Sequence, residues 1–184
     1  MVRFTLLTFV IAYGVSGVLI ILGNHGYATS GFPDSLPQVL ANVPFAIYIL
    51  SPAIASYIVL RRSGDVANLR QWLGTVFHVK NGVGLYAYVV GVLALYFLIH
   101  LVVSGPTGMA MPFSMFFLAL PGNLIIGGLE EAGWVYVLQS RLQTATGYLA
   151  SCLLMSVLWL LWHLPLFFIP GTGHSAGVID FWMF

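Results

Sequence analysis

The stretch VGLYAYVVGVLALYFLIHLVV, residues 83–103, indicates the class of fold on its own. Its 21 residues contain no Asp, Glu, Lys or Arg, and a helix of that length, at about 1.5 Å per residue, crosses the roughly 30 Å hydrocarbon core of a membrane. The whole chain agrees, because 60% of its 184 residues are apolar, 6% are charged and the mean hydropathy is +0.98. A soluble domain carries about 25% charged residues. The composition therefore excludes a soluble globule and a disordered chain and predicts an integral membrane protein.

Four further apolar runs predict an all-α membrane protein, a bundle of about five transmembrane helices. Strands of a membrane barrel would alternate apolar and polar residues over segments of about ten, whereas these runs are apolar on most faces. Because there is no internal repeat and no linker, residues 1–184 are expected to form a single multi-pass membrane domain. The five runs are residues 4–22, 43–60, 83–103, 112–138 and 148–168.

The positions of the basic residues predict the orientation. All six fall before the first run, between the second and third, or after the fourth, and these places share one side of the membrane. The positive-inside rule makes that side cytoplasmic, so we expect a protein of the cell membrane with a cytoplasmic N-terminus and the lipid bilayer as its surroundings. A net charge of +1 excludes a nucleic-acid binder. The six basic residues are Arg3, Arg61, Arg62, Arg70, Lys80 and Arg141. We interpret the loop that holds Arg61, Arg62, Arg70 and Lys80 mainly as a topology determinant; it can also touch anionic lipid headgroups, but its charges are too widely spread to indicate a specific site.

Glu130 and Glu131 are the only acidic or basic residues inside the five runs, histidines apart. A charged side chain at the bilayer centre costs at least about 2.5 kcal/mol, and adjacent carboxylates repel each other, so the pair indicates a functional site. Adjacent residues point about 100° apart around a helix, which predicts different roles for the two. Pro121 and Gly122 should break the run and leave a shorter helix that carries both glutamates toward the cytoplasmic end. The plainer interpretation is a pair at a helix end that reaches water.

His163 in the fifth run is expected to lie within one or two helical turns of Glu130, because a short turn joins the two helices. A carboxylate and an imidazole in a wet pocket can hydrolyse a peptide bond. Glu130 would take a proton from water and return it to the leaving amine, while His163 would donate to the developing oxyanion. Pro165, two residues later, frees the carbonyl of Leu161 for another partner.

Two strings in these runs resemble the first two motifs of the CPBP family of intramembrane proteases, which includes the CAAX prenyl endopeptidases and bacteriocin-processing and immunity proteins. EEAGWVYVLQSRLQ, residues 130–143, resembles the EExxxR motif, and WLLWHLPLFF, residues 159–168, resembles the FxxxH motif. The resemblance implies that Glu130 activates water, that Glu131 is its partner and that His163 is a catalytic histidine. It also implies an intramembrane endopeptidase whose substrate is a hydrophobic peptide or a membrane-anchored protein.

Trp134 and Trp159 stand within these strings and are candidates for substrate contacts, although aromatic side chains are as common in helix packing and interfacial belts. A metal site is not expected, because the sequence has no HExxH motif and catalytic zinc typically has three protein ligands. A third ligand would have to come from a residue such as His100. We therefore assign no cofactor and leave a metal requirement open.

The resemblance, which spans residues 123–170, departs from the family pattern at two points. Val135 stands where EExxxR has its arginine, which removes the cation that would pair with Glu131, unless a base such as Arg62 compensates. A later HxxxN-type motif has no counterpart, and His174 does not supply it, so we expect a truncated chain that lacks the C-terminal part of the family core. The alternative function is a non-catalytic membrane binding or immunity factor derived from the same family. A proton-coupled transporter ranks last, because repeat symmetry is absent.

Overall fold

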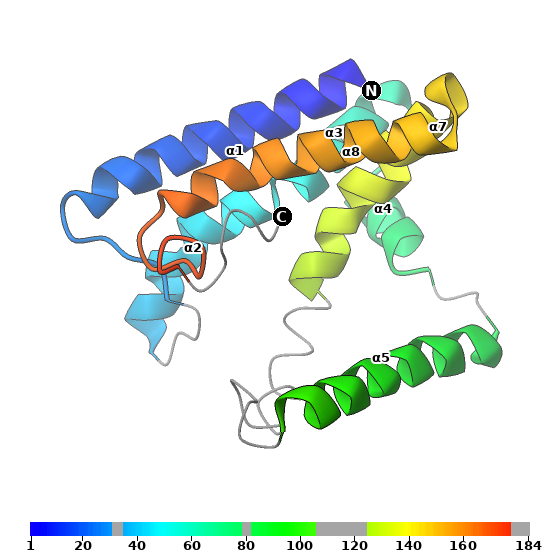
Figure 1. Ribbon diagram of the computed structural model, residues 1–184. Coiled ribbons are helices and arrows are strands. Elements are labelled where there is room, and N and C mark those ends of the chain that lie inside the picture. The colour runs from blue at the N-terminus through cyan, green and yellow to red at the C-terminus, as the bar shows by residue number, and fades with distance from the viewer. Residues whose placement is uncertain (31–34, 79–81, 106–124, 178–184) are drawn as a thin grey trace.

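The computed structural model describes residues 1–30, 35–78, 82–105 and 125–177, and Figure 1 shows that helices make up most of these segments. No strand occurs within these ranges, so the all-α fold class is confirmed. Residues 125–133 are helical and run into the π-helix η1, and α8 runs into the 3₁₀ helix η2. The elements are α1 (Val2–Gly23), α2 (Leu36–Ile49), α3 (Ser51–Ser63), α4 (Leu69–Val76), α5 (Val83–Ser104), η1 (Trp134–Gln139), α7 (Ser140–Thr146), α8 (Tyr148–His163) and η2 (Leu164–Phe167).

The membrane spans follow the apolar runs of the sequence. Three predicted spans are helices long and apolar enough to cross a membrane, namely α1, α5, and α8 continued by η2. The span predicted over residues 43–60 is the pair of α2 and α3, which meet at a bend of 55°. The run 112–138 begins outside the described ranges, and only its part from residue 125 onward is described. The described residues thus hold three candidate spans, or four if the bent pair is one span, and this fits an all-α membrane bundle.

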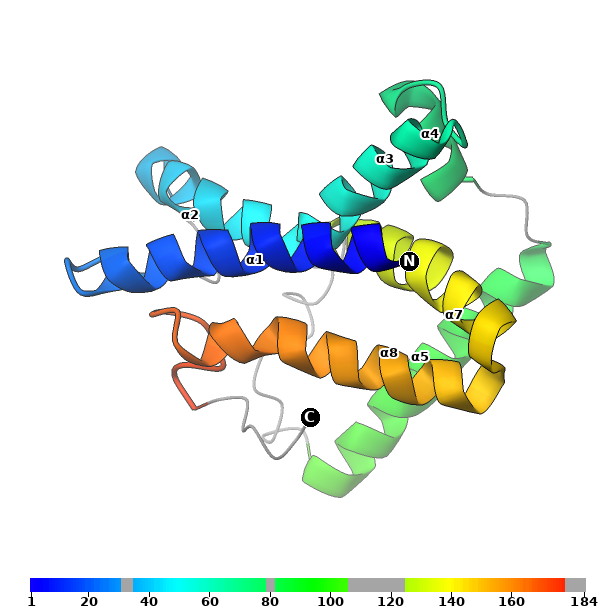
Figure 2. The same cartoon turned by 90° about the horizontal axis from the view of Figure 1, so that it is seen from above.

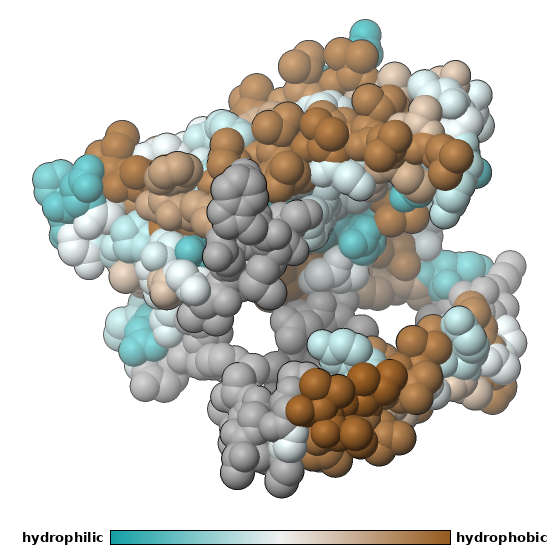
Figure 3. All heavy atoms as spheres, viewed as in Figure 1, coloured by the Kyte–Doolittle hydropathy of each residue, from teal (hydrophilic) through white to brown (hydrophobic). Residues whose placement is uncertain are grey.

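The outer surface is apolar over the long helices. Leu6 and Val10 of α1 and Leu149 and Leu153 of α8 are all more than half exposed. Figure 3 shows hydrophobic side chains over α1, α8 and α5. Apolar surface of this extent on several helices fits contact with lipid, because a soluble protein rarely exposes large apolar patches to water.

One face of α1 packs against α2 and α3. Figure 2 shows these two helices on one side of α1 and α8 on the other. The buried residues of α1 recur every three or four positions, and three of the five are small, which lets helix backbones approach each other closely inside a membrane. They are Phe4, Thr8, Ala12, Ser16 and Leu19.

The bundle has two chemically different ends. At the basic end, Arg3, Arg62 and Arg141 line one cavity. At the loop end, Gly23 packs against Pro170, so closely that a Cβ on Gly23 would lie 2.6 Å from the proline ring. The 22 residues of α1 separate the two ends by roughly 33 Å at about 1.5 Å per residue. Because α8 follows α7 and leads toward Pro170, it runs from the basic end to the loop end.

The junction of α2 and α3 follows from the sequence Leu50-Ser51-Pro52. Pro52 has no amide hydrogen to donate to a preceding turn, so it occupies the first turn of a new helix. Ser51 and Pro52 are fully buried there. Gly133 approaches the junction at backbone distance, because a Cβ on this glycine would lie 2.6 Å from the carbonyl oxygen of Pro52.

The change Gly133→Ala is expected to destabilise the bundle, because the added Cβ would overlap a backbone oxygen that cannot swing away. Overpacking costs about 1–3 kcal/mol, so thermal unfolding followed by circular dichroism in detergent should give a lower Tm. Gly127→Ala is the matched control on the same helix, since a Cβ there meets nothing within 4 Å. Equal Tm values for the two variants would contradict the close approach to Pro52.

Candidate active site

The two glutamates lie at the end of the helical residues 125–133, directly before the π-helix. A π-helix is rare and is found mostly as a short insertion in an α-helix, often at functional sites. Trp134, Val137 and Leu138 bury one side of it against the bundle. The irregular backbone therefore comes after Glu130 and Glu131 and leaves them on a regular helix, where adjacent side chains diverge.

Four fully buried aromatic side chains from four segments form what we name the aromatic column: Phe4, Trp134, Trp162 and Tyr48. The rings of Phe4 and Trp134 meet edge to face with centroids 5.9 Å apart, as do those of Trp134 and Trp162. Trp162 and Tyr48 are stacked, with centroids 5.1 Å apart. Such pairs add stability beyond the area they bury. The aromatic column thereby fastens the π-helix to the last turn of α8.

Two tyrosines bind the carbonyl groups at the end of α8. The hydroxyl of Tyr13 on α1 donates to the carbonyl of Leu161 at 2.7 Å, and the hydroxyl of Tyr48 on α2 donates to the carbonyl of Trp162. Pro165 has no amide hydrogen to donate to the Leu161 carbonyl, so the sequence predicted another partner for this carbonyl. The Tyr13 hydroxyl is such a partner. Together the bonds hold the last turn of α8 against α1 and α2.

Glu130 and His163 line one cavity of about 310 Å³. The two side chains thus converge from consecutive helices, as their spacing predicted. Residues of the loop end, among them Thr29, Gly171 and His174, contribute much of its wall. Besides Glu130 and His163, the lining residues are Thr29, Ser30, Phe45, Ile49, Trp162, Leu166, Gly171, Thr172, Gly173 and His174.

The imidazole of His163 is oriented by its own helix and by two indoles. Its Nδ1 lies 2.8 Å from the carbonyl oxygen of Trp159. A carbonyl oxygen can only accept a hydrogen bond, so Nδ1 carries the hydrogen and Nε2 of the neutral ring carries a lone pair. The rings of Trp159 and Trp162 lie with centroids 3.7 and 4.7 Å from that of His163. The ring is therefore fixed in one tautomer and one plane.

The carboxylate of Glu130 lies between two indoles. The indole of Trp159 interacts with it as a hydrogen-bond donor. The indole nitrogen of Trp134 is buried and approaches the same carboxylate, although its geometry falls short of a regular hydrogen bond. Indole N–H groups beside a half-buried carboxylate partly replace the water that it has lost.

Glu131 faces away from this cavity and lines a second one, of about 280 Å³. Val135 and Trp72 are among its other lining residues, which confirms that Val135 stands beside Glu131 where the motif has arginine. No Lys or Arg occurs among the described residues of this lining, and Arg62 lies in the cavity of the basic end. Arg62 is therefore not placed to compensate for the missing cation.

Trp134 and Trp159 differ in their access to a substrate. Trp134 is 0% exposed and belongs to the aromatic column, whereas Trp159 is half-buried against His163. Neither is among the described residues that line the Glu130 cavity. Their assignment as substrate contacts stays a prediction.

His174, assigned to no site from the sequence, is a lining residue of the cavity. It lines the same wall as His163, with ring centroids 6.1 Å apart, and it packs edge to face on Phe167. A bond from the Thr29 amide to the Pro170 carbonyl, 2.9 Å long, holds the turn that brings it there. Burial lowers the pKa of His174, which favours its neutral form near pH 7. The glycine- and proline-rich sequence after residue 169 predicts that the chain turns there. It does not predict that the turn packs against Thr29.

No group of three or more His, Cys, Asp or Glu side chains that could hold a metal ion occurs in the part of the chain that the structure describes. The His100 side chain, considered above as a third ligand, lies outside the described residues. Glu130, His163 and His174 share a cavity wall without forming such a group.

Residues 111–183, about two fifths of the chain, match the family model described as type II CAAX prenyl endopeptidase Rce1-like. Over this segment the chain is Rce1-like. The Rce1-like segment contains both strings that resemble the CPBP motifs, and the resemblance to that family is thereby confirmed. No curated protein and no solved structure gives a significant match. The match over residues 111–183 and the apolar helices together support a relation to the CAAX-type intramembrane proteases.

The change Val135→Arg is expected to raise the Tm, because its guanidinium would enter the cavity that Glu131 lines. A partly exposed ion pair contributes roughly 0.2–1 kcal/mol. Val135→Met is the control for side-chain length without charge, and the gain should vanish when Glu131→Gln is added. If Val135→Arg and Val135→Met unfold at the same temperature in detergent, the position does not serve as the site of the motif's cation.

Proposed function

We propose that the protein is an intramembrane endopeptidase in which Glu130 activates water to hydrolyse a peptide bond. The observation that supports this best is the shared cavity of Glu130 and His163, two motif residues on consecutive helices of the Rce1-like segment. Its substrate would be a hydrophobic peptide or a membrane-anchored protein, since a membrane protease of this family meets its substrate in or beside the bilayer.

The tautomer of His163 suggests how the water is held. With Nδ1 donating to Trp159, Nε2 is an acceptor, so a neutral His163 cannot be the oxyanion donor expected from the sequence. Nε2 and the Glu130 carboxylate instead accept the two hydrogens of one water molecule, which leaves an oxygen lone pair directed at the substrate carbonyl. Holding the reactants in this way lowers the entropic part of the barrier.

The reaction then needs a single proton carrier. Glu130 takes a proton from the water while the water oxygen forms a bond to the substrate's carbonyl carbon. Glu130 then passes that proton to the amide nitrogen as the carbon–nitrogen bond breaks. The products are a carboxylic acid and an amine, and Glu130 returns to its starting state. Glu131, in its separate cavity, acts as a positioning residue through the helix that it shares with Glu130.

A non-catalytic binding or immunity factor is the second candidate. One observation favours it: Val135 leaves Glu131 without the arginine of the motif, and no described residue of that cavity replaces the cation. Cleavage of a peptide by the purified wild-type protein would exclude this candidate.

The change Glu130→Gln tests the enzymatic function. It keeps the shape of the side chain and removes the base, so cleavage of a fluorogenic hydrophobic peptide by the full chain in proteoliposomes should fall by about 10²–10⁴-fold. Asp65→Asn, an exposed carboxylate at the basic end, is the control and should retain activity. Wild-type activity in a folded Glu130→Gln protein would exclude Glu130 as the base.

For orientation, we propose a cell-membrane protein with the basic end in the cytoplasm, which places the Glu130 cavity toward the outer face. In a Cys152→Ala background, a membrane-impermeant maleimide should label His25→Cys in intact cells, because His25 is exposed at the loop end. Ala67→Cys, exposed between α3 and α4, should react only after permeabilisation. The reverse labelling pattern would show that the basic end is outside.

A further inference from the structure

The cavity at the basic end is larger than either glutamate cavity, with a volume of about 700 Å³. Three segments that are far apart in the sequence each contribute one arginine to it: Arg3 from α1, Arg62 from α3 and Arg141 from α7. These are three of the six basic residues of the chain. The fold therefore gathers three arginines that are far apart along the sequence.

The positive charge of this cavity is only partly neutralised. No Asp or Glu is among its described lining residues. Arg141 pairs with Asp65 at 3.5 Å, but the two side chains are 38% and 53% exposed, and an ion pair so open to solvent holds its partners weakly. Within the described residues, neither Arg3 nor Arg62 forms an ion pair. The site keeps a net attraction for an anion.

The rest of the lining is apolar and follows the helix away from the arginines. Val2, Leu6 and Val10 recur at every fourth position of α1, so they share one face, and each is more than 60% exposed. Ile58 and Val59 of α3 complete the apolar wall. A ligand that fits this lining has an anionic head and a hydrocarbon tail.

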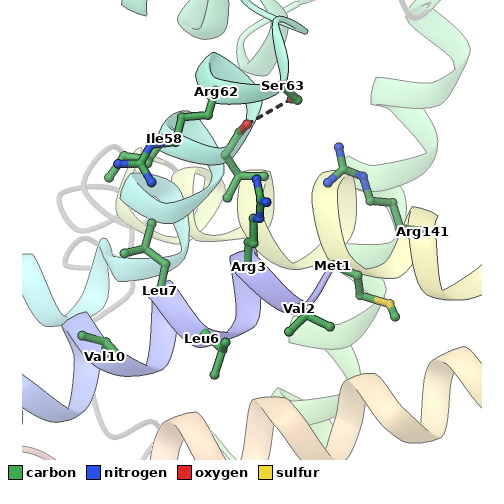
Figure 4. Close-up of a pocket in the computed structure, with 11 residues that line it drawn as sticks. Met1, Val2, Arg3, Leu6, Leu7, Val10, Ile58, Arg62, Ser63 and Arg141 are labelled. Atoms are coloured by element: carbon green, nitrogen blue, oxygen red, sulfur yellow. Dashed lines mark hydrogen bonds between the residues drawn. The ribbon is translucent and has the colours of Figure 1, made fainter.

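The cavity also lies at the end of the bundle and not midway along its helices. α1 begins at Val2 and α3 ends at Ser63, so two helix ends meet at the cavity. Figure 4 shows the side chains of Arg3 and Leu7 extending from α1 toward α3, whereas those of Val2 and Leu6 extend to the other side of α1. The arginines thus mark the headgroup level and the leucine and valine side chains the start of the hydrocarbon.

We propose that this cavity binds one anionic glycerophospholipid, with its phosphate among the guanidinium groups of Arg3, Arg62 and Arg141 and an acyl chain along α1. Guanidinium groups bind phosphate oxygens through paired, charge-assisted hydrogen bonds, which favours a phosphate over a diffuse negative charge. The cavity is not a part of the candidate active site, because that cavity lies toward the other end of α1. The inference is therefore independent of the proposed peptidase activity.

Phosphatidylglycerol added to the full chain in a neutral detergent tests the proposal. Native mass spectrometry should show one retained phosphatidylglycerol, and the Tm should rise with its concentration, because a ligand that binds only the folded state stabilises it. Phosphatidylcholine should be retained more weakly, since its headgroup carries no net charge. Equal binding of the two lipids would overturn the proposal, and an equal Tm rise with inorganic phosphate alone would reduce the site to a simple anion site and overturn it as well.

Three variants locate the bound lipid. Arg62→Gln should weaken phosphatidylglycerol binding by roughly fivefold, the effect of one basic residue near an anionic headgroup. Leu6→Trp, which keeps every charge, should block the apolar part of the cavity and also weaken binding, so the test survives if Arg62→Gln fails to fold. Arg70→Gln is the matched control, because Arg70 is exposed on α4 and does not line the cavity. Wild-type affinity in both Arg62→Gln and Leu6→Trp would place the lipid elsewhere.

Discussion

The junction of α2 and α3 holds the two helices on which the candidate site depends. The backbone of Gly133 packs against Pro52 so closely that any side chain at position 133 would overlap the Pro52 carbonyl oxygen. This contact positions the helix that carries Glu130, three residues before Gly133. Ser51, one position earlier, accepts the indole hydrogen of Trp162 at 2.9 Å, and this fixes the turn of α8 that carries His163. A carboxylate and an imidazole from separate helices therefore share a cavity because both helices are fastened to the same buried dipeptide.

Much of this arrangement could be predicted from the sequence, because the bilayer restricts the possibilities. A run of about 20 apolar residues has to be a helix in a membrane, which located α1, α5 and α8. A short turn between two helices makes them neighbours, which predicted the convergence of Glu130 and His163. The divergence of Glu130 and Glu131 into two cavities follows from the angle between adjacent helical residues.

Hydropathy did not reveal the features that depend on contacts between distant residues. Residues 43–60 are apolar on both sides of the bend, so the run looked continuous although Pro52 begins a new helix. The place of His174 depends on a backbone bond from Thr29, a residue 145 positions earlier. The cavity lined by Arg3, Arg62 and Arg141 likewise forms only when α1, α3 and α7 pack together. The spacing of charges along the sequence does not predict this packing.

The separation of the two glutamates bears on the missing arginine at Val135. If both carboxylates faced one closed cavity, loss of the motif's cation would leave two uncompensated buried charges, which is strongly unfavourable. Glu131 is instead exposed in a cavity of its own, where water can solvate its charge. Glu130 keeps the indoles of Trp134 and Trp159 beside it, and His163 keeps the tautomer set by Trp159. The substitution at position 135 therefore removes a stabilising ion pair without removing any group that contacts the proposed water.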